Sequence, residues 1–362
     1  MAKVYFSDVV VIGAGLAGER TAIECASKGL SVNIISLVEP RRSHSNAAQG
    51  GIQASLANMK ESEGDDWKTH FEDTVRGSDW GADQDVVELV CKLAPSLVRE
   101  MEYFGTPFSR TKDGKIAQRN FGGTAKWRTC YASDGTGHAL LYAMDSQVCR
   151  LKIPVFTRQQ AISLIHNGQK CSGVITRDMA SGEIRAFVGK ATVLATGGYG
   201  RLYRESTNAL INFGDGMNLA FETGIVPLGN MEAVQFHPTG LVQNGILMTE
   251  GCRGDGGVLL DKDGREFMRD YAPKAKNNGN LASRDVVARG MMKRIRDGFG
   301  VKSPHGEYLW LDIKRLGKEH IEKKLSDIAF ICRNFIGVDP VKDLIPVRPV
   351  QHYSMGGVRT NI

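Results

Sequence analysis

Hydrophobic and polar positions change period sharply within the first forty residues. Residues 8–12 (DVVVI) form a short apolar run, which is typical of a parallel strand buried on both faces. A helical pattern follows over residues 16–28, with Gly29 as its stop, and residues 31–36 form a second apolar run. This order of strand, helix and strand predicts a nucleotide-binding α/β unit.

The turn between the first strand and the helix fits the G-x-G-x-x-G fingerprint of dinucleotide-binding folds. Its residues are Gly13, Ala14, Gly15, Leu16, Ala17 and Gly18. Glycines there allow a tight turn and bring backbone N–H groups and the helix dipole close to a pyrophosphate. Where an acid ordinarily binds the ribose, at the end of the second strand, the chain has Ser36, so a dinucleotide other than NAD is favoured.

Later segments support a two-segment FAD domain. The stretch KATVLATGGYG reads as a buried strand ending in Thr196-Gly197-Gly198, which such domains place beneath the same cofactor. Residues 171–189 read as a strand, a turn and a strand, expected as a small antiparallel layer over the flavin domain. Asp215 precedes a helical segment, where its carboxylate either caps that helix or accepts bonds from a ribityl chain.

Composition narrows the class of protein. The chain has 362 residues, of which 42% are hydrophobic and 24% charged, enough apolar material for packed cores. Its seven cysteines lack metal or cluster spacing, so we expect no metal site and a reducing compartment. The net charge of +6 is mild and spread out, which argues against nucleic acid. We expect no secretion signal, and no apolar run of about 18 residues predicts a membrane span.

The loop RRSHSNAAQGG, residues 41–51, fits neither a helix nor a strand pattern. Taken in order with GAGLAG, ATGGYG, QFHPTG, MTEGCRGDGG, LASRDVVAR and QHYSMGG, it makes the whole chain closely resemble the flavoprotein subunits of fumarate reductases and succinate dehydrogenases. The resemblance implies an FAD-dependent oxidoreductase that interconverts fumarate and succinate by hydride transfer. It also implies an iron-sulfur subunit, membrane anchor subunits carrying quinone, and a peripheral position on the cytoplasmic side of the cell membrane.

The resemblance implies a domain organisation within the α/β class. A Rossmann-like FAD-binding domain is expected over residues 1–230 and an inserted α+β capping domain over residues 231–345. Residues 346–362 return to the FAD-binding domain, and its C-terminal remainder is expected to be absent. Family members continue past Ile362 and contribute a further substrate-binding arginine, so the chain is not expected to complete its own active site.

Cofactor contacts follow from the same resemblance. In the family, the histidine of the R-S-H motif is joined covalently to the flavin, and His44 occupies that position. An imidazole bonded to the flavin withdraws electrons from the ring and raises its potential. The other residues expected to contact FAD, besides the glycine turn, are Ser36, Ser43, Ser45, Gln49, Gly50, Gly51, Ala161, Thr196, Gly197, Gly198 and Asp215.

Six residues match substrate or proton-transfer positions of the family. His237 donates hydrogen bonds to a dicarboxylate, Thr249 contacts substrate, and His352 binds a substrate carboxylate. Arg284 delivers the proton, and Glu250 and Arg253 pass protons to it. Simpler roles stay open for each type of residue: a packed turn histidine, a surface salt bridge, or an ion pair between Arg284 and Asp285 at a helix start.

Two other functions stay open. L-aspartate oxidase shares similar motifs, but its flavin is not covalently held, so the histidine in the R-S-H loop argues against it. The second alternative is a non-catalytic flavin-binding fragment, which visible flavin without fumarate reduction would identify.

Overall fold

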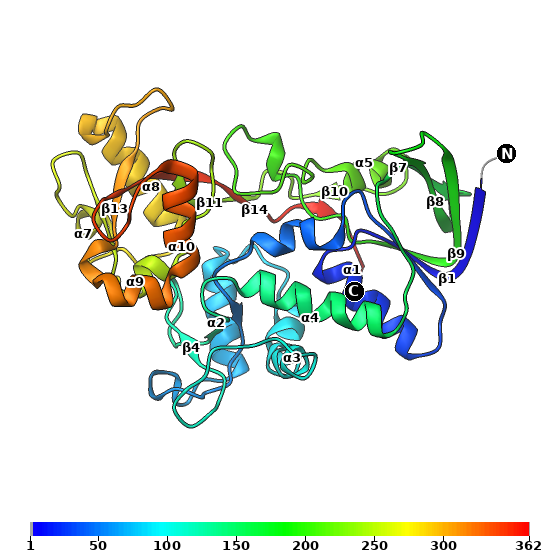
Figure 1. Ribbon diagram of the computed structural model, residues 1–362, viewed down its shortest axis with the longest axis horizontal. Helices are drawn as coiled ribbons and strands as arrows, with labels where there is room; N and C mark the ends of the chain where they lie inside the picture. The colour runs from blue at the N-terminus through cyan, green and yellow to red at the C-terminus, as the bar shows by residue number, and fades with distance from the viewer. Residues whose placement is uncertain (1–2, 362) are drawn as a thin grey trace.

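The computed structural model describes residues 3–361; residues 1–2 and 362, at the two ends of the predicted domains, lie outside the described residues. Its largest sheet has the order β6-β2-β1-β9-β8-β7 (Figure 1). The strands are β1 (Lys3–Ile12), β2 (Val32–Ile35), β6 (Val155–Phe156), β7 (Gln159–His166), β8 (Cys171–Asp178) and β9 (Ile184–Leu194). Strands β6, β2, β1 and β9 are parallel, and β8 and β7 continue the sheet antiparallel.

Two details of this sheet differ from the sequence prediction. Strand β1 begins at Lys3 rather than residue 8, because its first half also pairs with β9, from Lys3 opposite Arg185 onward. The predicted antiparallel layer of residues 171–189 is not separate. Its second strand, β9, pairs with β8 on one edge and with β1 on the other, so both belong to one sheet.

Helices cover one face of this sheet. They are α1 (Leu16–Ser27), α3 (Gln84–Tyr103) and α4 (Thr136–Arg150), whereas α2 (Trp67–Gly77) packs against α3 in a separate apolar cluster. Along β1, Val9 and Val11 pack into the core that contains the helices, whereas Val10 and Ile12 join a second core on the other face. The prediction that this strand is buried on both faces is therefore confirmed. Helix α1 ends at Ser27, one residue before the predicted end.

Glu19 of α1 is an unusual member of this helix packing. Its side chain is fully buried, and neither carboxylate oxygen has a hydrogen-bond partner within residues 3–361. Burial and, to a smaller extent, the nearby Asp145 raise the pKa of Glu19 to about 8, with Arg41 opposing part of the shift. The folded protein therefore holds Glu19 as the neutral acid at pH 7.

A four-stranded antiparallel sheet, in the order β11-β14-β13-β12, organises the second half of the chain. Its strands are β11 (Val234–Leu241), β12 (Val258–Leu260), β13 (Leu309–Asp312) and β14 (Ile345–Ser354). Around it lie α6 (Gly251–Gly254), α7 (Met268–Tyr271), α8 (Arg284–Arg294), α9 (Lys318–Lys324) and α10 (Ser326–Ile331). The helix predicted over residues 284–296 is α8 and the π-helical turn Ile295–Phe299 that follows it. A separate apolar core fills this region, with members from Leu241 to Val347.

Strands β11 and β14 form a ribbon that joins the two regions (Figure 1). At one end of the ribbon, Leu241 pairs with Val347 inside the apolar core of the second half of the chain. At the other end, Val234 pairs with Ser354. The remaining elements are β3 (Ile52–Gln53), β4 (Gln118–Arg119), β5 (Thr129–Cys130), β10 (Leu228–Gly229), α5 (Asp215–Phe221) and β15 (Gly357–Val358). None of the helices in the described part of the chain is long and apolar enough to cross a membrane.

Candidate active site

A cavity of about 950 Å³ lies at the carboxyl ends of β1, β2 and β9. This is where open α/β sheets bind nucleotides. Fourteen of the predicted cofactor residues line it: Gly13, Ala14, Gly15, Leu16, Ala17, Ser36, Ser43, His44, Ser45, Ala161, Thr196, Gly197, Gly198 and Asp215. We call this space the nucleotide cavity.

Two glycines of the fingerprint, Gly13 and Gly18, have different structural roles. Gly13 has φ +112°, and a Cβ there would lie 2.1 Å from the carbonyl oxygen of Ala195, at the end of β9. A Cβ on Gly18 would lie 1.9 Å from the Gly13 oxygen, so Gly18 packs α1 against the turn rather than lining the cavity. Gly13 thus lets two strand ends meet, and Gly18 brings the helix close to both.

The amino end of α1 faces the nucleotide cavity without a side-chain cap of its own. Its N-cap is Gly15, which has no side-chain oxygen, and the hydroxyl of Ser45 accepts a hydrogen bond from the Leu16 N–H at 3.2 Å. First-turn N–H groups and the helix dipole favour an anion at this point. The residues present therefore fit a dinucleotide pyrophosphate.

Ser36 and Asp215 also border the nucleotide cavity. Ser36 is buried just beyond the end of β2, where NAD-binding folds place an acid for the ribose hydroxyls. Asp215 is the first residue of α5, and its N-cap is Gly214, so Asp215 is not the cap of this helix. Burial raises the pKa of the Asp215 carboxyl.

His44 lies where the nucleotide cavity meets a second cavity of about 1010 Å³. Its Nδ1 accepts a hydrogen bond from the Ala209 N–H at 3.2 Å. Burial lowers the pKa of His44 to about 4, and the charge of Arg201 contributes to the same shift. The imidazole is therefore neutral at pH 7, and Nε2 is the ring nitrogen that is not bound to the backbone.

The second cavity collects most of the predicted catalytic residues. It is lined by His237, Thr249, Glu250, Arg284 and His352, which come from β11, the segment before α6, α8 and β14. Gln49, Gly50 and Gly51, predicted as cofactor contacts, line this second cavity and not the nucleotide cavity. No group of three or more His, Cys, Asp or Glu side chains within residues 3–361 is arranged to hold a metal ion.

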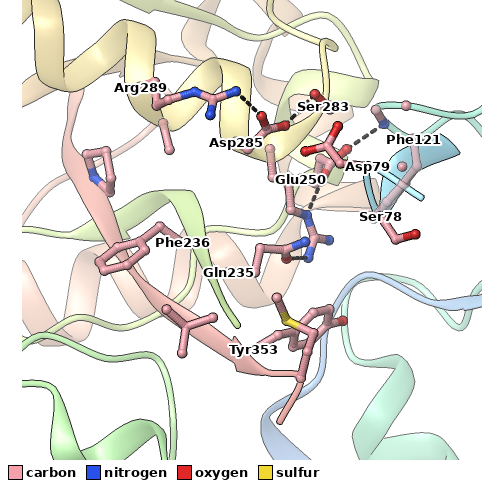
Figure 2. A pocket seen from close by; sticks show the side chains of 18 of the residues that line it. Ser78, Asp79, Phe121, Gln235, Phe236, Glu250, Ser283, Asp285, Arg289 and Tyr353 are labelled. Atoms are coloured by element: carbon pink, nitrogen blue, oxygen red, sulfur yellow. Dashed lines mark hydrogen bonds and ion pairs between the residues drawn. The ribbon is translucent and has the colours of Figure 1, made fainter. Parts of the chain in front are cut away.

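Arg284 borders the second cavity and bonds to residues other than its sequence neighbour Asp285, which Figure 2 shows turned toward Ser283 and Arg289. Its Nε donates to Glu250 Oε2 at 2.8 Å, and an Nη donates to Gln235 Oε1 at 2.7 Å. Asp285 instead bonds to Ser283 and Arg289. The alternative of a local Arg284–Asp285 ion pair is therefore excluded.

Glu250 is almost completely buried and still ionised. Burial alone raises its pKa, but the charges of Arg284 and Arg253 outweigh that effect and lower the pKa below its usual value. Burial lowers the pKa of Arg284, and the adjacent Glu250 carboxylate more than reverses this, giving a net increase. Because the group is buried, a surface salt bridge is not an adequate description of it.

Arg253 lies behind Glu250 and is fully buried. One of its Nη atoms donates to the Asn280 carbonyl, and the other lies 3.9 Å from Glu250 Oε2. That separation suits an ion pair and exceeds a hydrogen bond. Burial lowers the pKa of Arg253, with a further contribution from Arg284.

His237 and His352 lie side by side, with ring centres 5.0 Å apart. The Thr239 N–H donates to His237 Nδ1 at 3.2 Å, and the Thr207 hydroxyl lies 2.6 Å from His352 Nδ1. Burial lowers the pKa of both rings well below the usual value, and Arg284 adds to the shift. With His237 Nδ1 accepting from the backbone, Nε2 carries the hydrogen that a carboxylate can accept.

Sequence reasoning missed several neighbours of these groups. Gln235 is two residues before His237 on β11, so strand alternation was a signal that both share a face. Thr207 and Tyr353 had no comparable signal. Thr207 belongs to a loop far from His352 in sequence, and the Tyr353 ring lies 5.4 Å from the Arg284 guanidinium.

Comparison with known proteins assigns this arrangement to a family. The family model described as an FAD binding domain matches residues 8–362. The chain belongs to this FAD-binding domain family, and its cofactor is FAD. The predicted α/β fold class is confirmed by the match.

Within that family, the predicted resemblance is also confirmed. The chain is 48% identical to a fumarate reductase flavoprotein subunit of Helicobacter pylori, over 99% of this chain and 57% of the relative. It is 47% identical to a succinate dehydrogenase flavoprotein subunit of Rickettsia conorii, over 98% of this chain and 59% of the relative. These relatives favour the fumarate reductase and succinate dehydrogenase assignment over L-aspartate oxidase.

Solved structures agree with this result. A mutant quinol fumarate reductase chain of E. coli superimposes with a TM-score of 0.92 at 38% identity, covering 99% of this chain and 62% of that chain. A succinate dehydrogenase complex of Mycobacterium smegmatis contains a chain with a TM-score of 0.80 at 36% identity, with 99% and 60% covered. The chain therefore spans about three fifths of the length of the proteins it matches.

Proposed function

We propose that the full-length protein interconverts fumarate and succinate at FAD. The observation that carries this proposal is the buried Arg284–Glu250 pair, which borders the second cavity together with His237 and His352. Cationic and N–H donors converge there from separate elements, an arrangement that suits a dianion. Bound FAD supplies a hydride acceptor and donor at the junction with the nucleotide cavity.

The chain's own residues have separate roles in this proposal. His237 and His352 donate hydrogen bonds from Nε2 to the substrate carboxylates, and Thr249 adds a hydroxyl to the same wall. The Arg284 guanidinium donates a proton to the substrate carbon. Glu250 Oε2, 2.8 Å from Arg284 Nε, then passes on to Arg284 a proton that the ionised carboxylate first accepts from the side of Arg253. Arg253, with an Nη 3.9 Å from that oxygen, continues the proton path, and its charge lowers the pKa of Glu250 so that the carboxyl readily gives the proton up.

The covalent link between FAD and His44 is part of the same proposal. The supporting observation is a neutral imidazole held at Nδ1 by the Ala209 N–H, which leaves Nε2 to form the bond. Because Nδ1 accepts that hydrogen bond, Nε2 carries the ring hydrogen. Forming the bond would release this proton and one from the flavin methyl group, with two electrons passing to the flavin ring. The position of His44 between the two cavities is consistent with an attachment at the flavin ring.

Partners, location and domain boundaries are also proposals. The solved relatives are described as quinol fumarate reductase and as succinate dehydrogenase complexes, and one is described with menaquinol molecules. On that basis we propose an iron-sulfur subunit, membrane anchor subunits and a peripheral site on the cytoplasmic face of the cell membrane. The division at residues 1–230, 231–345 and 346–362 is proposed with it, and the two separate apolar cores support a boundary near residue 231.

The direct test is turnover by the full-length protein. Reduced viologen dye should be oxidised when fumarate is added, and succinate should accumulate in equal amount. L-aspartate should not be oxidised by the same preparation. A yellow protein that binds flavin but converts neither dicarboxylate would identify the non-catalytic alternative and contradict the proposal.

A further inference from the structure

The segment that follows β5 and runs into the first turn of α4, residues 132–137, contacts two distant parts of the chain. On one side it touches the loop that carries His44, and on the other it touches the amino end of α10. Residues of this segment and of α10 line the second cavity together. We call residues 132–137 the bridging segment.

The contact with the histidine loop is made mainly through backbone. The Gly137 N–H donates to the Ala48 carbonyl at 2.6 Å, and the Thr136 hydroxyl donates to the Gln49 carbonyl at 3.2 Å. A Cβ on Gly137 would lie 2.2 Å from the carbonyl oxygen of Ser45. The bridging segment therefore follows any movement of the histidine loop closely.

The contact with α10 is made by one carboxylate. Asp134 is 1% exposed, and its Oδ2 accepts hydrogen bonds from the N–H groups of Asp327 at 2.8 Å and Ile328 at 3.1 Å. These are first-turn donors of α10, and a negative group at that end of a helix is favourable. Ile328 is itself fully buried in the apolar core of the second half of the chain, so the hydrogen bond connects Asp134 to that core.

The backbone conformation of the bridging segment is held by hydrogen bonds within the segment and to Ser109. Ser133 has φ +49°, a left-handed conformation that is unfavourable for a non-glycine residue and persists only when contacts enforce it. Its N–H donates to the Ser109 hydroxyl at 3.1 Å, and the Ala132 N–H donates to the Thr136 hydroxyl at 3.1 Å. At Gly135, a Cβ would lie 2.9 Å from Asp327 Oδ2.

We propose that Asp134 is a positioning residue that sets the separation between α10 and the histidine loop across the second cavity. It acts through the bridging segment and through its bonds to α10, not on the reacting atoms. This inference rests on the proposed function, because it takes the second cavity to be the dicarboxylate site. Loss of the carboxylate leaves two buried N–H groups without their acceptor, which loosens the cavity wall formed by α10.

The experiment compares Asp134→Ala, Asp134→Asn and Asp66→Ala in the full-length, flavin-loaded protein. Asp66 also caps a helix, α2, through the Thr69 N–H, so its replacement is a matched loss of a cap at another place. Hydrogen exchange at residues 326–331 and the affinity for malonate, followed by flavin absorbance, need no turnover. KM and kcat for fumarate are measured on the same samples.

For Asp134→Ala we expect roughly tenfold faster exchange at Asp327 and Ile328, with flavin content unchanged. Malonate affinity and KM should weaken by about the same factor, whereas kcat should change less than about threefold. Asp134→Asn keeps one acceptor oxygen and should recover most of the loss. If Asp134→Ala unfolds, the asparagine variant carries the test, with smaller shifts in the same directions expected.

Unchanged exchange and malonate affinity in Asp134→Ala would overturn the proposal. Equal changes at residues 326–331 in Asp66→Ala would also overturn it, because the effect would then be general destabilisation. Failure of the parent protein to reduce fumarate would count against the proposed function alone, since the exchange measurement does not depend on turnover.

Discussion

The two cavities that meet at His44 are built by different means. The nucleotide cavity is formed largely by backbone, at glycines where a single Cβ would collide with another strand end. The second cavity is formed by side chains, with a buried ion pair and two neutral histidines from elements far apart in sequence. Backbone sites tolerate no added atom, whereas side-chain sites tolerate shape changes but not the loss of a charge or a donor.

The largest effect on turnover is expected for Arg284→Lys in the full-length protein. Lysine keeps the charge but lacks the planar guanidinium, which donates hydrogen bonds to Glu250 and to Gln235 at the same time. The kcat for fumarate should therefore fall about 10³-fold or more. Flavin content and dicarboxylate binding should remain close to normal. Steady-state kinetics and flavin absorbance measure both properties.

Arg289→Lys is the control for this variant, because it lies on the same helix and pairs with Asp285 on the exposed face. It should retain most of the turnover. His237→Ser should weaken substrate binding together with turnover, in contrast to the arginine variant. Retention of most activity by Arg284→Lys would place the proton donor elsewhere.

Gly13→Ala tests the backbone cavity. Its Cβ would lie 2.1 Å from the Ala195 oxygen at φ +112°, so the strand ends must separate and flavin affinity should fall about 10²-fold. Gly29→Ala is the matched control, since Gly29 also has positive φ, +80°, but has open space around its Cβ position. It should cost about 1 kcal/mol of stability and leave flavin content unchanged. Equal flavin loss in both variants would mean that backbone strain at positive φ, and not the collision of the Cβ with Ala195, lowers the flavin affinity.

His44→Ser tests the junction between the cavities. The protein should bind FAD without a covalent bond, and its fluorescence should disappear from a denaturing gel. Succinate oxidation should fall by roughly tenfold or more, and fumarate reduction should fall less, because oxidation requires the higher flavin potential. Release of all flavin from the unmodified protein by acid precipitation would contradict the covalent proposal.

Glu19→Gln should leave turnover unchanged and alter only stability. Because the folded pKa of Glu19, about 8, lies above its value in the unfolded chain, the folded state binds more protons between these two values. The free energy of unfolding therefore falls as pH rises from about 4.5 to 8. At pH 8 the free energy of unfolding of the glutamine variant should exceed that of the parent protein by about 1 kcal/mol or more, and near pH 4 the two proteins should differ little. Thermal midpoints at both pH values would reveal this, and parallel curves for the two proteins would refute it.

Local patterns made the nucleotide half of this site predictable. The glycine turn, its flanking strands and the helix α1 follow from one continuous stretch of about thirty residues. The meeting of Gly13 with Ala195 could not be read from that stretch, because it depends on which strand lies beside β1. The same reason explains why residues 171–189 were assigned to a separate layer.

The side-chain half was predicted by resemblance and not by pattern. The resemblance placed Glu250 in the proton path to Arg284, and the sequence also offered Asp285 as an alternative ion-pair partner of Arg284. Burial decides between them, since a carboxylate enclosed with two arginines is a stronger partner than an exposed one. Asp134 had no signal at all, because the helix that it caps begins almost two hundred residues later.

The nucleotide cavity is built from segments far apart in the chain: β1 pairs with β9, and the residues after β14 also line the cavity. The cavity can therefore be completed only late in protein synthesis. Val358 borders the nucleotide cavity and leaves the ribosome roughly 300 residues after His44. At ordinary translation rates this interval lasts about 15–60 s. Throughout that time the nascent chain lacks part of the cavity wall, so the proposed covalent attachment of flavin at His44 is expected only after translation is complete.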